Sequence, residues 1–429
     1  FSIVFTILFI YFLAYFPGIY SSDSINQVMQ ATGLEQFHNW HTPFHTLTIK
    51  IILKLFHHIG FYILIQIIFA SILFAWILSK LKLKNLELYL ILIFSFPLTG
   101  LMLIVLWKDI PFSLSLIWLS FLLYFAYNDK NYLKNNLNLI AFIISLSFVM
   151  LFRYNGIPIV IIVLIIMLFL FKEHIKRVFV ILLSLILIYS FSEILFYKIL
   201  KVERTPFKYQ KDIFILSEYV VSNFPFNSQE RKIIEEILSY EDIKNNYNCY
   251  WLSSIFFWQV QNFNYNKFKE NRREIRKILV KATSKDIKPL INHTICSSSY
   301  LWYPIALHNL YLIEYTYDRF ISGEIPQAKL VRNLKLPQIR EIIEIITNWL
   351  RELTSFIFKP FIYTYILLIT FILIKNLRIL ITPSLLNILM LVFITPDPNF
   401  RFILSSYLLS IIILPMIIKA LKLSNYATD

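Results

Sequence analysis

Long apolar runs recur along the chain and are separated by short polar connections. The runs are rich in Ile, Leu and Phe, and as helices they are long enough to cross the roughly 30 Å hydrocarbon layer of a bilayer. About ten such runs are expected, at residues 1–16, 60–79, 86–106, 110–127, 137–152, 156–171, 178–199, 356–374, 377–395 and 400–418. The pattern therefore predicts an all-α, polytopic transmembrane helical bundle.

Two polar segments interrupt this series. We expect an N-terminal membrane module at 1–199 with a first outer loop at 17–59, a helical extracytoplasmic segment at 200–355, and C-terminal membrane helices at 356–429. Apolar and charged residues alternate at helical spacing in three stretches of the long segment, 229–240, 266–282 and 337–353. The aromatic stretch 297–320 between the last two is interpreted as an interfacial belt, with a saccharide-stacking platform as the alternative.

Basic residues mark one side of the membrane. They cluster in alternate connections, at Lys80, Lys82, Lys84, Lys130, Lys134, Lys172, Lys176, Arg177, Lys375, Arg378, Lys419 and Lys422. Because cytoplasmic loops retain positive charge, we attribute the net charge of +15 to topology rather than to nucleic-acid binding. The loop 17–59 and the segment 200–355 then lie outside the cytoplasm. This topology requires 43–58, with Lys50 and Lys54 on one helical face, to lie in the membrane interface instead of spanning it.

The composition excludes an ordinary soluble globular protein. Hydrophobic residues make up 58% of the chain and charged residues 16%, which is more apolar than a soluble fold of this length can bury. The abundance of Lys, Asn, Ile and Phe indicates an AT-rich bacterial genome, so we expect the bacterial cytoplasmic membrane. The chain begins at Phe1 inside an apolar run, so residues are expected to precede it. Cys249 and Cys296 can form one disulfide or remain two free thiols, because their spacing fits both.

The first outer loop holds the first candidates for chemistry. Asp23 lies in YSSDS. Either it serves the following helix, which Ser22 or Asp23 would cap, or it is a carboxylate held at the membrane surface as a base or metal ligand. Gly33 is expected to end the helix that follows Asp23. Three histidines, His38, His41 and His45, come next, and Thr42–Pro43 predicts a helix start that brings the last two near each other. They are candidates for metal or phosphate binding, with interfacial filler as the alternative.

Three short outer turns carry lone charges between apolar runs. WKDIP contributes Lys108 and Asp109, FRYNGIP contributes Arg153 and Asn155, and TPDPNFRF contributes Asp397 and Arg401. Each charge alone is explained by snorkelling or local pairing. Together, on one side of one bundle, they are typical of a pocket for an anionic lipid phosphate.

The chain resembles the GT-C superfamily of integral membrane glycosyltransferases, in an uncharacterised bacterial branch. The resemblance rests on a first span followed by an acidic outer loop, on amphipathic helices in that loop, on the large outer segment after seven spans, and on YSSDS, NWHTPFHT, WKDIPFS and RYNG. It implies transfer of a sugar from a polyprenyl-phosphate donor to an extracytoplasmic glycan, lipid or protein. Asp23 matches the loop carboxylate of such enzymes, and Lys108, Arg153 or Arg401 would hold the lipid phosphate.

The resemblance leaves the metal and the second acid open. A divalent ion, Mg²⁺ or Mn²⁺, has Asp23, Asp109 and Asp397 as candidate ligands, and Glu35 is a further candidate for the second acid. A base near lipid and aromatic rings is expected to have a raised pKa, and direct displacement by one base would invert the anomeric centre. The alternatives are a transporter or flippase for a lipid-linked or anionic solute, and a non-catalytic membrane scaffold.

Overall fold

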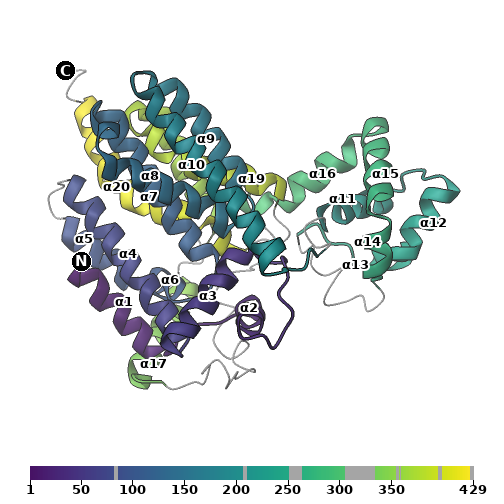
Figure 1. Cartoon of the computed structure of the whole chain (residues 1–429), viewed down its shortest axis with the longest axis horizontal. Helices are drawn as coiled ribbons and strands as arrows, with labels where there is room; N and C mark the ends of the chain where they lie inside the picture. The colour runs from purple at the N-terminus through teal and green to yellow at the C-terminus, as the bar shows by residue number, and fades with distance from the viewer. Residues whose placement is uncertain are drawn as a thin grey trace. The chain divides into compact units, whose positions relative to one another are not determined.

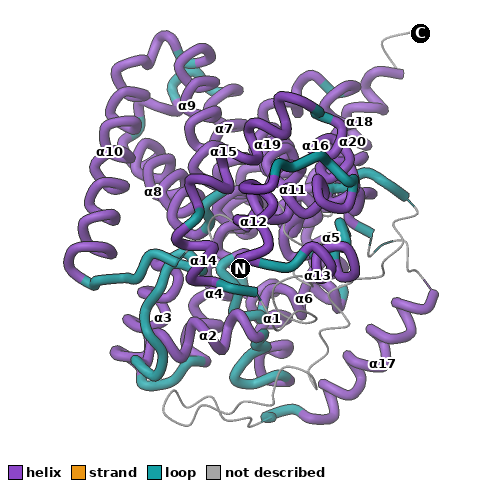
Figure 2. Tube along the Cα trace, turned by 90° about the vertical axis from the view of Figure 1, so that its right-hand side faces the viewer, coloured by secondary structure: helices purple, strands orange, loops and turns teal. Residues whose placement is uncertain are grey.

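The computed structural model describes residues 1–81, 86–205, 210–250, 263–304, 334–353, 357, 359–394 and 399–425. In this part of the chain the secondary structure consists of helices, with isolated bridges and no named strand (Figure 2). The prediction of an all-helical chain is confirmed for these residues. The chain divides into two compact units, and each is described by itself.

The first unit contains the apolar helices, apart from the last residues of Arg378–Ile394, because the second unit includes Leu389–Asn399 (Figure 1). Among the residues that the structure describes, five segments are long and apolar enough to cross a membrane: Gly60–Leu81, Asp109–Asn128, Lys172–Ile199, Lys375–Ile394 and Phe400–Leu421. Four shorter apolar helices accompany them: Ser2–Ala14, Asn136–Phe152, Gly156–Leu170 and Pro360–Leu373. The chain is thus a membrane protein, and the figure of about ten spans remains a prediction.

In Figure 1 these segments carry their own labels. They are α1 (Ser2–Ala14), α4 (Gly60–Leu81), α5 (Leu86–Ser95), α6 (Pro97–Leu103), α7 (Asp109–Asn128), α8 (Asn136–Phe152), α9 (Gly156–Leu170), α10 (Ile175–Glu193), α18 (Pro360–Leu373), α19 (Arg378–Ile394) and α20 (Leu404–Asn425). Helix α7 packs against α4, α8 and α20, so its first turn starts among several neighbours.

The apolar run 86–106 folds as two helices, α5 and α6. Pro97 is the first residue of α6, where its missing N–H costs no helical hydrogen bond. The hydroxyl of Tyr11 donates to the carbonyl oxygen of Ser95 (2.8 Å), and a Cβ on Gly100 would lie 2.4 Å from the Tyr11 ring. Only glycine therefore permits this approach of α1 to α6.

The first outer loop folds into α2 (Ser22–Thr32) and α3 (Pro43–Phe56). The expectation that Ser22 or Asp23 caps α2 is wrong, because Ser21 is the N-cap and forms a capping box with Ser24. Gly33 ends the helix with φ of 81°, as predicted. Since Ser21 satisfies the backbone donors, the side chain of Asp23 is available for other contacts.

Helix α3 begins with Pro43 at its first position and Thr42 at its N-cap, as the sequence predicts. Lys50 and Lys54 are both exposed. The interfacial position of this helix stays a prediction.

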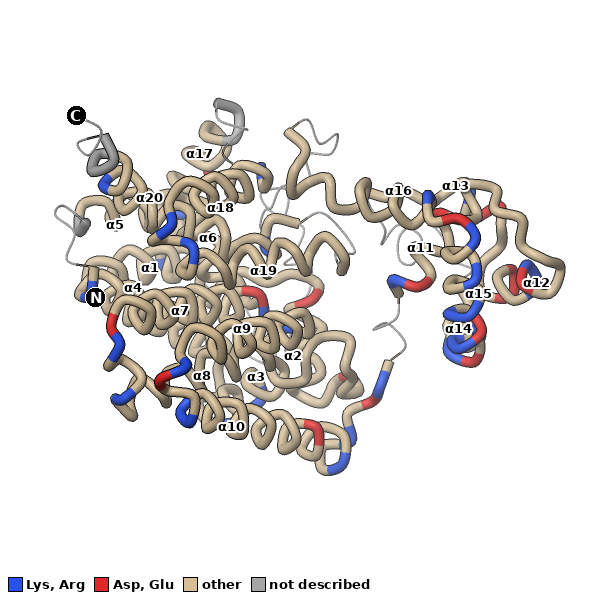
Figure 3. Tube along the Cα trace, turned by 90° about the horizontal axis from the view of Figure 1, so that it is seen from above, with Lys and Arg blue, Asp and Glu red and all other residues tan. Residues whose placement is uncertain are grey.

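The second unit comprises Arg204–Leu310 and Leu389–Asn399. Its described helices are α11 (Gln210–Val221), α12 (Ser228–Ile237), α13 (Tyr240–Asn246), α14 (Tyr265–Glu270), α15 (Arg272–Lys285) and α16 (Lys288–Ser297). Helix α11 contacts α13, α15 and α16 around an apolar core. Lys, Arg, Asp and Glu line α12, α14 and α15, in contrast to the mostly uncharged membrane helices (Figure 3).

The predicted helical stretches of the long polar segment are helices. Residues 229–240 and 266–282 fall on α12 to α15, and 337–353 is α17 (Pro337–Leu353), which belongs to the first unit. Cys249 and Cys296 form a disulfide, with their Cα atoms 5.7 Å apart. Most of the aromatic stretch 297–320 lies outside the described residues.

Candidate functional site

Charged side chains from distant parts of the chain meet at one end of the first unit. They come from the first turn of α2, the loop before α3, the start of α7, the turn after α8, and the short helix Phe400–Ile403 before α20. The residues are Asp23, His41, Lys108, Asp109, Arg153 and Arg401. We call this group the charge cluster. Every member is a candidate named from the sequence: Asp23 and His41 in the first outer loop, and the other four as lone charges at outer turns.

Arg401 joins the two carboxylates of the charge cluster. Its Nη1 atom donates to Oδ2 of Asp23 (2.7 Å), and its Nε atom lies 3.9 Å from Oδ2 of Asp109. Arg153 donates through Nη1 to Oδ1 of Asp109. The side chain of Asp109 is completely buried, whereas that of Asp23 is 28% exposed. Asp109 is therefore fixed inside the protein, and Asp23 is the carboxylate that an incoming molecule can reach.

Aromatic rings hold the two guanidinium groups. The Cζ atom of Arg401 lies 5.0 Å from the centroids of both Trp107 and Phe402, and that of Arg153 lies 4.6 Å from the same Phe402 ring. Such cation–π contacts favour the charged group while limiting its access to water. Trp107 also donates its ring N–H to Oγ of Ser21 (2.6 Å), which links the α2 cap to the cation of Arg401.

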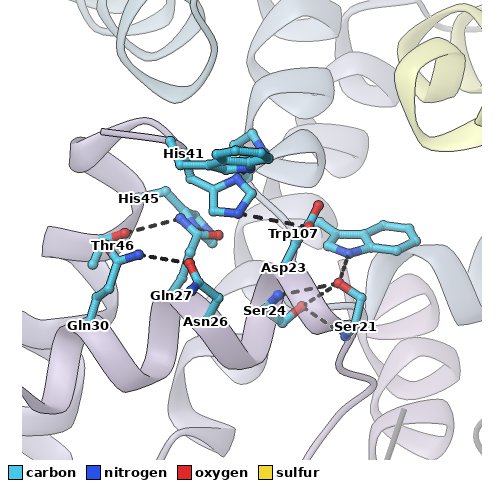
Figure 4. A network of polar contacts seen from close by, with 12 residues as sticks. Ser21, Asp23, Ser24, Asn26, Gln27, Gln30, His41, His45, Thr46 and Trp107 are labelled. Carbon is cyan, nitrogen blue, oxygen red and sulfur yellow. Dashed lines mark hydrogen bonds and ion pairs between the residues drawn. The ribbon is translucent and has the colours of Figure 1, made fainter. Parts of the chain in front are cut away.

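His41 lies between Lys108 and Asp23. Nζ of Lys108 donates to Nδ1 of His41 (2.9 Å). Nε2 of His41 lies 3.9 Å from Oδ1 of Asp23 (Figure 4). Because an ammonium group can only donate, Nδ1 accepts and the proton of the neutral ring belongs on Nε2. His41 thus turns an N–H towards the carboxylate of Asp23.

Burial and charge shift the pKa values of these groups. Burial alone would raise the pKa of Asp23, but the charge of Arg401, the neighbouring N–H of His41 and the charge of Lys108 outweigh it and hold the pKa well below its usual range. The expectation of a raised pKa for this base is therefore wrong, because it left out the cations. Burial, and then the charge of Lys108, hold the pKa of His41 well below its ordinary value. Burial likewise lowers the pKa of Lys108.

His45 belongs to a neighbouring neutral network. Its Nδ1 atom donates to Oε1 of Gln27 (3.0 Å), and Nε2 of Gln27 donates to Oγ1 of Thr46 (3.1 Å) (Figure 4). The side chain of His45 is fully buried, and burial lowers its pKa to about 3. His45 thus packs α3 against α2 as a neutral ring and does not contact the charge cluster directly.

Glu35 and His38 lie close to each other elsewhere in the first outer loop. The carboxylate of Glu35 lies 3.7 Å from Nε2 of His38 and accepts a hydrogen bond from Asn26 (2.7 Å). Of the two candidates for a second acid, Asp109 is the one that the structure brings to Asp23 through their shared partner Arg401.

Asn155 is linked to the segment that carries Arg401 through a second buried amide, that of Asn387. Its side-chain amide donates to Oδ1 of Asn387 (2.9 Å), and Asn387 donates in turn to the carbonyl oxygen of Phe402 (3.1 Å). Both amides are buried. These two hydrogen bonds hold the segment that carries Arg401. Asn155 therefore has a structural role, in addition to the phosphate-binding role predicted for it from the sequence.

The donor groups of the charge cluster already have partners of their own, which bears on a divalent cation at this site. Asp23 and Asp109 already face Arg401, and the second nitrogen of His41 faces Lys108. Among the described residues, no three or more His, Cys, Asp or Glu side chains gather as metal ligands. Asp397 lies outside the described residues. A divalent cation at Asp23 would meet the positive side chains of Arg401 and Lys108, so the described donors fit an anion better than a metal ion.

Sequence reasoning missed four contributors to this site. Trp107, Phe402, Ser21 and Asn387 hold the charged groups, and each resembles an ordinary core or cap residue in the sequence. Two of them adjoin a predicted residue, since Trp107 precedes Lys108 and Phe402 follows Arg401. An aromatic residue beside a lone charge at a tight turn was thus the available signal.

The charge cluster has an excess of positive charge. With His41 neutral, three cations stand against the two carboxylates of Asp23 and Asp109. Comparison of the chain with protein-family models, with curated proteins and with solved structures finds no match. The function is therefore inferred from the geometry of this site.

Proposed function

We propose that the chain is a membrane glycosyltransferase of the GT-C type, which moves a sugar from a polyprenyl-phosphate donor to a hydroxyl of an extracytoplasmic glycan, lipid or protein. The observation that carries the proposal is the meeting of a partly exposed carboxylate, Asp23, with cations that exceed the carboxylates by one charge. A base and an anion site are the two parts that this transfer needs.

The cations suit the phosphate leaving group. A departing polyprenyl phosphate gains negative charge, so preorganised cations stabilise the transition state. Lys108 and Arg401 flank Asp23, whereas Arg153 is committed to the buried Asp109. We therefore assign Arg401 and Lys108 to the phosphate and Arg153 to the support of Asp109.

Asp23 would act as base only when the donor is bound. In the free protein its neighbours depress its pKa, which makes the carboxylate a weak proton acceptor. A phosphate that pairs with Arg401 and Lys108 removes part of that stabilisation, and the pKa of Asp23 rises. Asp23 then takes the proton of the acceptor hydroxyl as the oxygen attacks the anomeric carbon. The configuration of the sugar is inverted.

The transfer as proposed needs no divalent ion. Arg401 and Lys108, the two cations assigned to the phosphate, already supply the positive charge that Mg²⁺ or Mn²⁺ would bring. Activity is therefore expected to persist in the presence of a chelator.

The proposed topology has about ten spans, with the charge cluster and the second unit outside the bacterial cytoplasmic membrane. Two observations support it. Clusters of Lys and Arg occupy alternate connections. The Cys249–Cys296 disulfide belongs to the second unit, and disulfides persist in oxidising compartments.

The test is sugar transfer by purified protein in lipid nanodiscs. Radiolabelled polyprenyl-phosphate sugars serve as donors, and a bacterial envelope extract supplies the acceptors. Asp23→Asn keeps the shape but removes the base, and activity should fall about 10²- to 10⁴-fold. Asp129→Asn, at an exposed turn at the other end of α7, is the matched control and should keep full activity. An Asp23→Asn protein with full activity would end the proposal.

A further inference from the structure

Helix α17 presents an apolar stripe to its surroundings. Four side chains at helical spacing i, i+3, i+4 and i+7 are between 41% and 62% exposed, namely Ile342, Ile345, Ile346 and Trp349. On the adjacent side of the same helix, Ile343 and Thr347 are buried. The helix thus packs with only part of its apolar surface, and the remaining part needs another apolar environment.

The opposite side of α17 is polar. Glu341 and Asn348 are exposed, and Arg340 donates to the carboxylate of Glu344 (2.7 Å). The helix is therefore divided lengthwise into a packed sector, an apolar exposed sector and a polar sector. A helix of this kind matches the boundary between lipid chains and water.

Contacts fix the level of α17 along the bundle. Helix α17 packs against α1 and α6, and the backbone N–H of Lys335 donates to the carbonyl oxygen of Leu13 (3.2 Å) (Figure 1). Nζ of Lys335 lies 5.4 Å from the centroid of Phe16, and Cζ of Arg340 lies 5.7 Å from that of Tyr15. The start of α17 is therefore at the point where the apolar helix α1 ends.

The end of α3 also lies near the end of α1. The ring of Phe16, which contacts Lys335, also stacks on His58 just after α3, with centroids 5.2 Å apart. Helix α3 also has exposed apolar side chains, with Leu55 at 65%. Two amphipathic helices thus approach the end of α1, whose own large exposed apolar side chains are Ile3 and Ile10.

We propose that α17 is a membrane-interface helix, with Ile342, Ile345, Ile346 and Trp349 among the upper acyl chains. The lipid bilayer is the occupant because the stripe lies beside the end of an apolar helix that itself exposes apolar side chains to lipid. Trp349 is a residue type that concentrates at this depth, and Lys335 and Arg340 lie near the level of lipid phosphates. The inference does not depend on the proposed enzymatic function.

Single-cysteine labelling of the full chain in nanodiscs tests this assignment. The native cysteines are joined as a disulfide, so under non-reducing conditions a bimane maleimide reacts with the introduced thiol. Ile345→Cys and Trp349→Cys report on the apolar stripe, and Glu341→Cys and Asn348→Cys are matched controls on the exposed polar side of the same helix. All four positions are exposed, so folding should be retained.

Bimane at 345 and 349 is expected to emit at shorter wavelength and to be quenched by lipids that carry a nitroxide near the top of the acyl chain. Bimane at 341 and 348 should be quenched by iodide in water instead. Equal iodide quenching on both sides would overturn the proposal. Protection of 345 and 349 from both quenchers would also overturn it, because a protein partner or a second copy would then cover the stripe.

Discussion

Asp109 offers a direct test of how the charge cluster is built. Its side chain is completely buried and is paired with Arg153, which is 13% exposed. Asp109→Asn keeps the size of the side chain but leaves the guanidinium of Arg153 without its carboxylate. We expect a clear loss of stability, because a buried charge without its counterion is costly.

The magnitude follows from the surroundings of Arg153. Removal of one partner of a buried ion pair costs about 3–5 kcal/mol. Arg153 would keep its contacts with the rings of Phe112 and Phe402, at 5.5 and 4.6 Å. Since each such contact is worth about 0.5–2 kcal/mol, the net loss should fall near the lower limit, about 3 kcal/mol.

The assay is unfolding in mixed micelles by titration with a denaturing detergent, followed by tryptophan fluorescence. Glu173→Gln is the matched control, because Glu173 pairs with Lys130 at 4.0 Å with both side chains more than 70% exposed (73% and 86%). That change should cost less than about 0.5 kcal/mol. Equal stability of the Asp109→Asn and Glu173→Gln proteins would refute the view that Asp109 is a structural anchor.

Three further predictions concern the cap, the buried histidine and the disulfide. Ser21→Ala should destabilise the protein by about 1–2 kcal/mol in the same unfolding assay, and Ser22→Ala by less than about 0.5 kcal/mol, since only Ser21 caps α2; equal effects would contradict the cap. Burial lowers the pKa of His45 to about 3, so the ring stays neutral in the fold while the unfolded chain takes up a proton below pH of about 6.5. The free energy of unfolding should therefore decrease as the pH is lowered from 6 to 4, by up to about 1.4 kcal/mol per pH unit, and His45→Gln should flatten this dependence. If His45→Gln leaves the dependence unchanged, groups other than His45 cause it. Cys296→Ser frees the thiol of Cys249, and a membrane-impermeant maleimide added to intact spheroplasts should label this variant but not the unsubstituted chain; labelling only after permeabilisation would place the second unit in the cytoplasm.

Hydrophobic periodicity was sufficient to predict the helices of the membrane unit. Continuous apolar runs fold as helices wherever the structure describes them, because their backbone groups must be paired in an apolar environment. The break between α5 and α6 could also be read from Pro97. The packing of α1 on α6 could not, because it depends on the contact of Tyr11 with a glycine 89 positions further along the chain.

The candidate site was predicted as a set of residues but not as a set of pairs. The sequence predicts that Asp23 and Arg401 lie on the same side of the membrane. Their contact could not be predicted, because they are 378 positions apart and meet only through the arrangement of the helices. Their proximity determines the direction in which the pKa of Asp23 shifts, so the direction was predicted wrongly. The prediction of the α2 cap was wrong for a local reason. Ser21, Ser22 and Asp23 are all residue types that cap helices well, and a shift of one position decides which side chain remains available for other contacts.

The ring of Phe402 is shared by two guanidinium groups, which has a consequence for the evolution of the protein. A change at Arg153 alters the environment of Arg401 through this ring, and a change at Asp109 affects both. Substitutions at these four positions are therefore expected to be tolerated in combination and rejected singly. Related sequences that have diverged for a long time should show them covarying as a group.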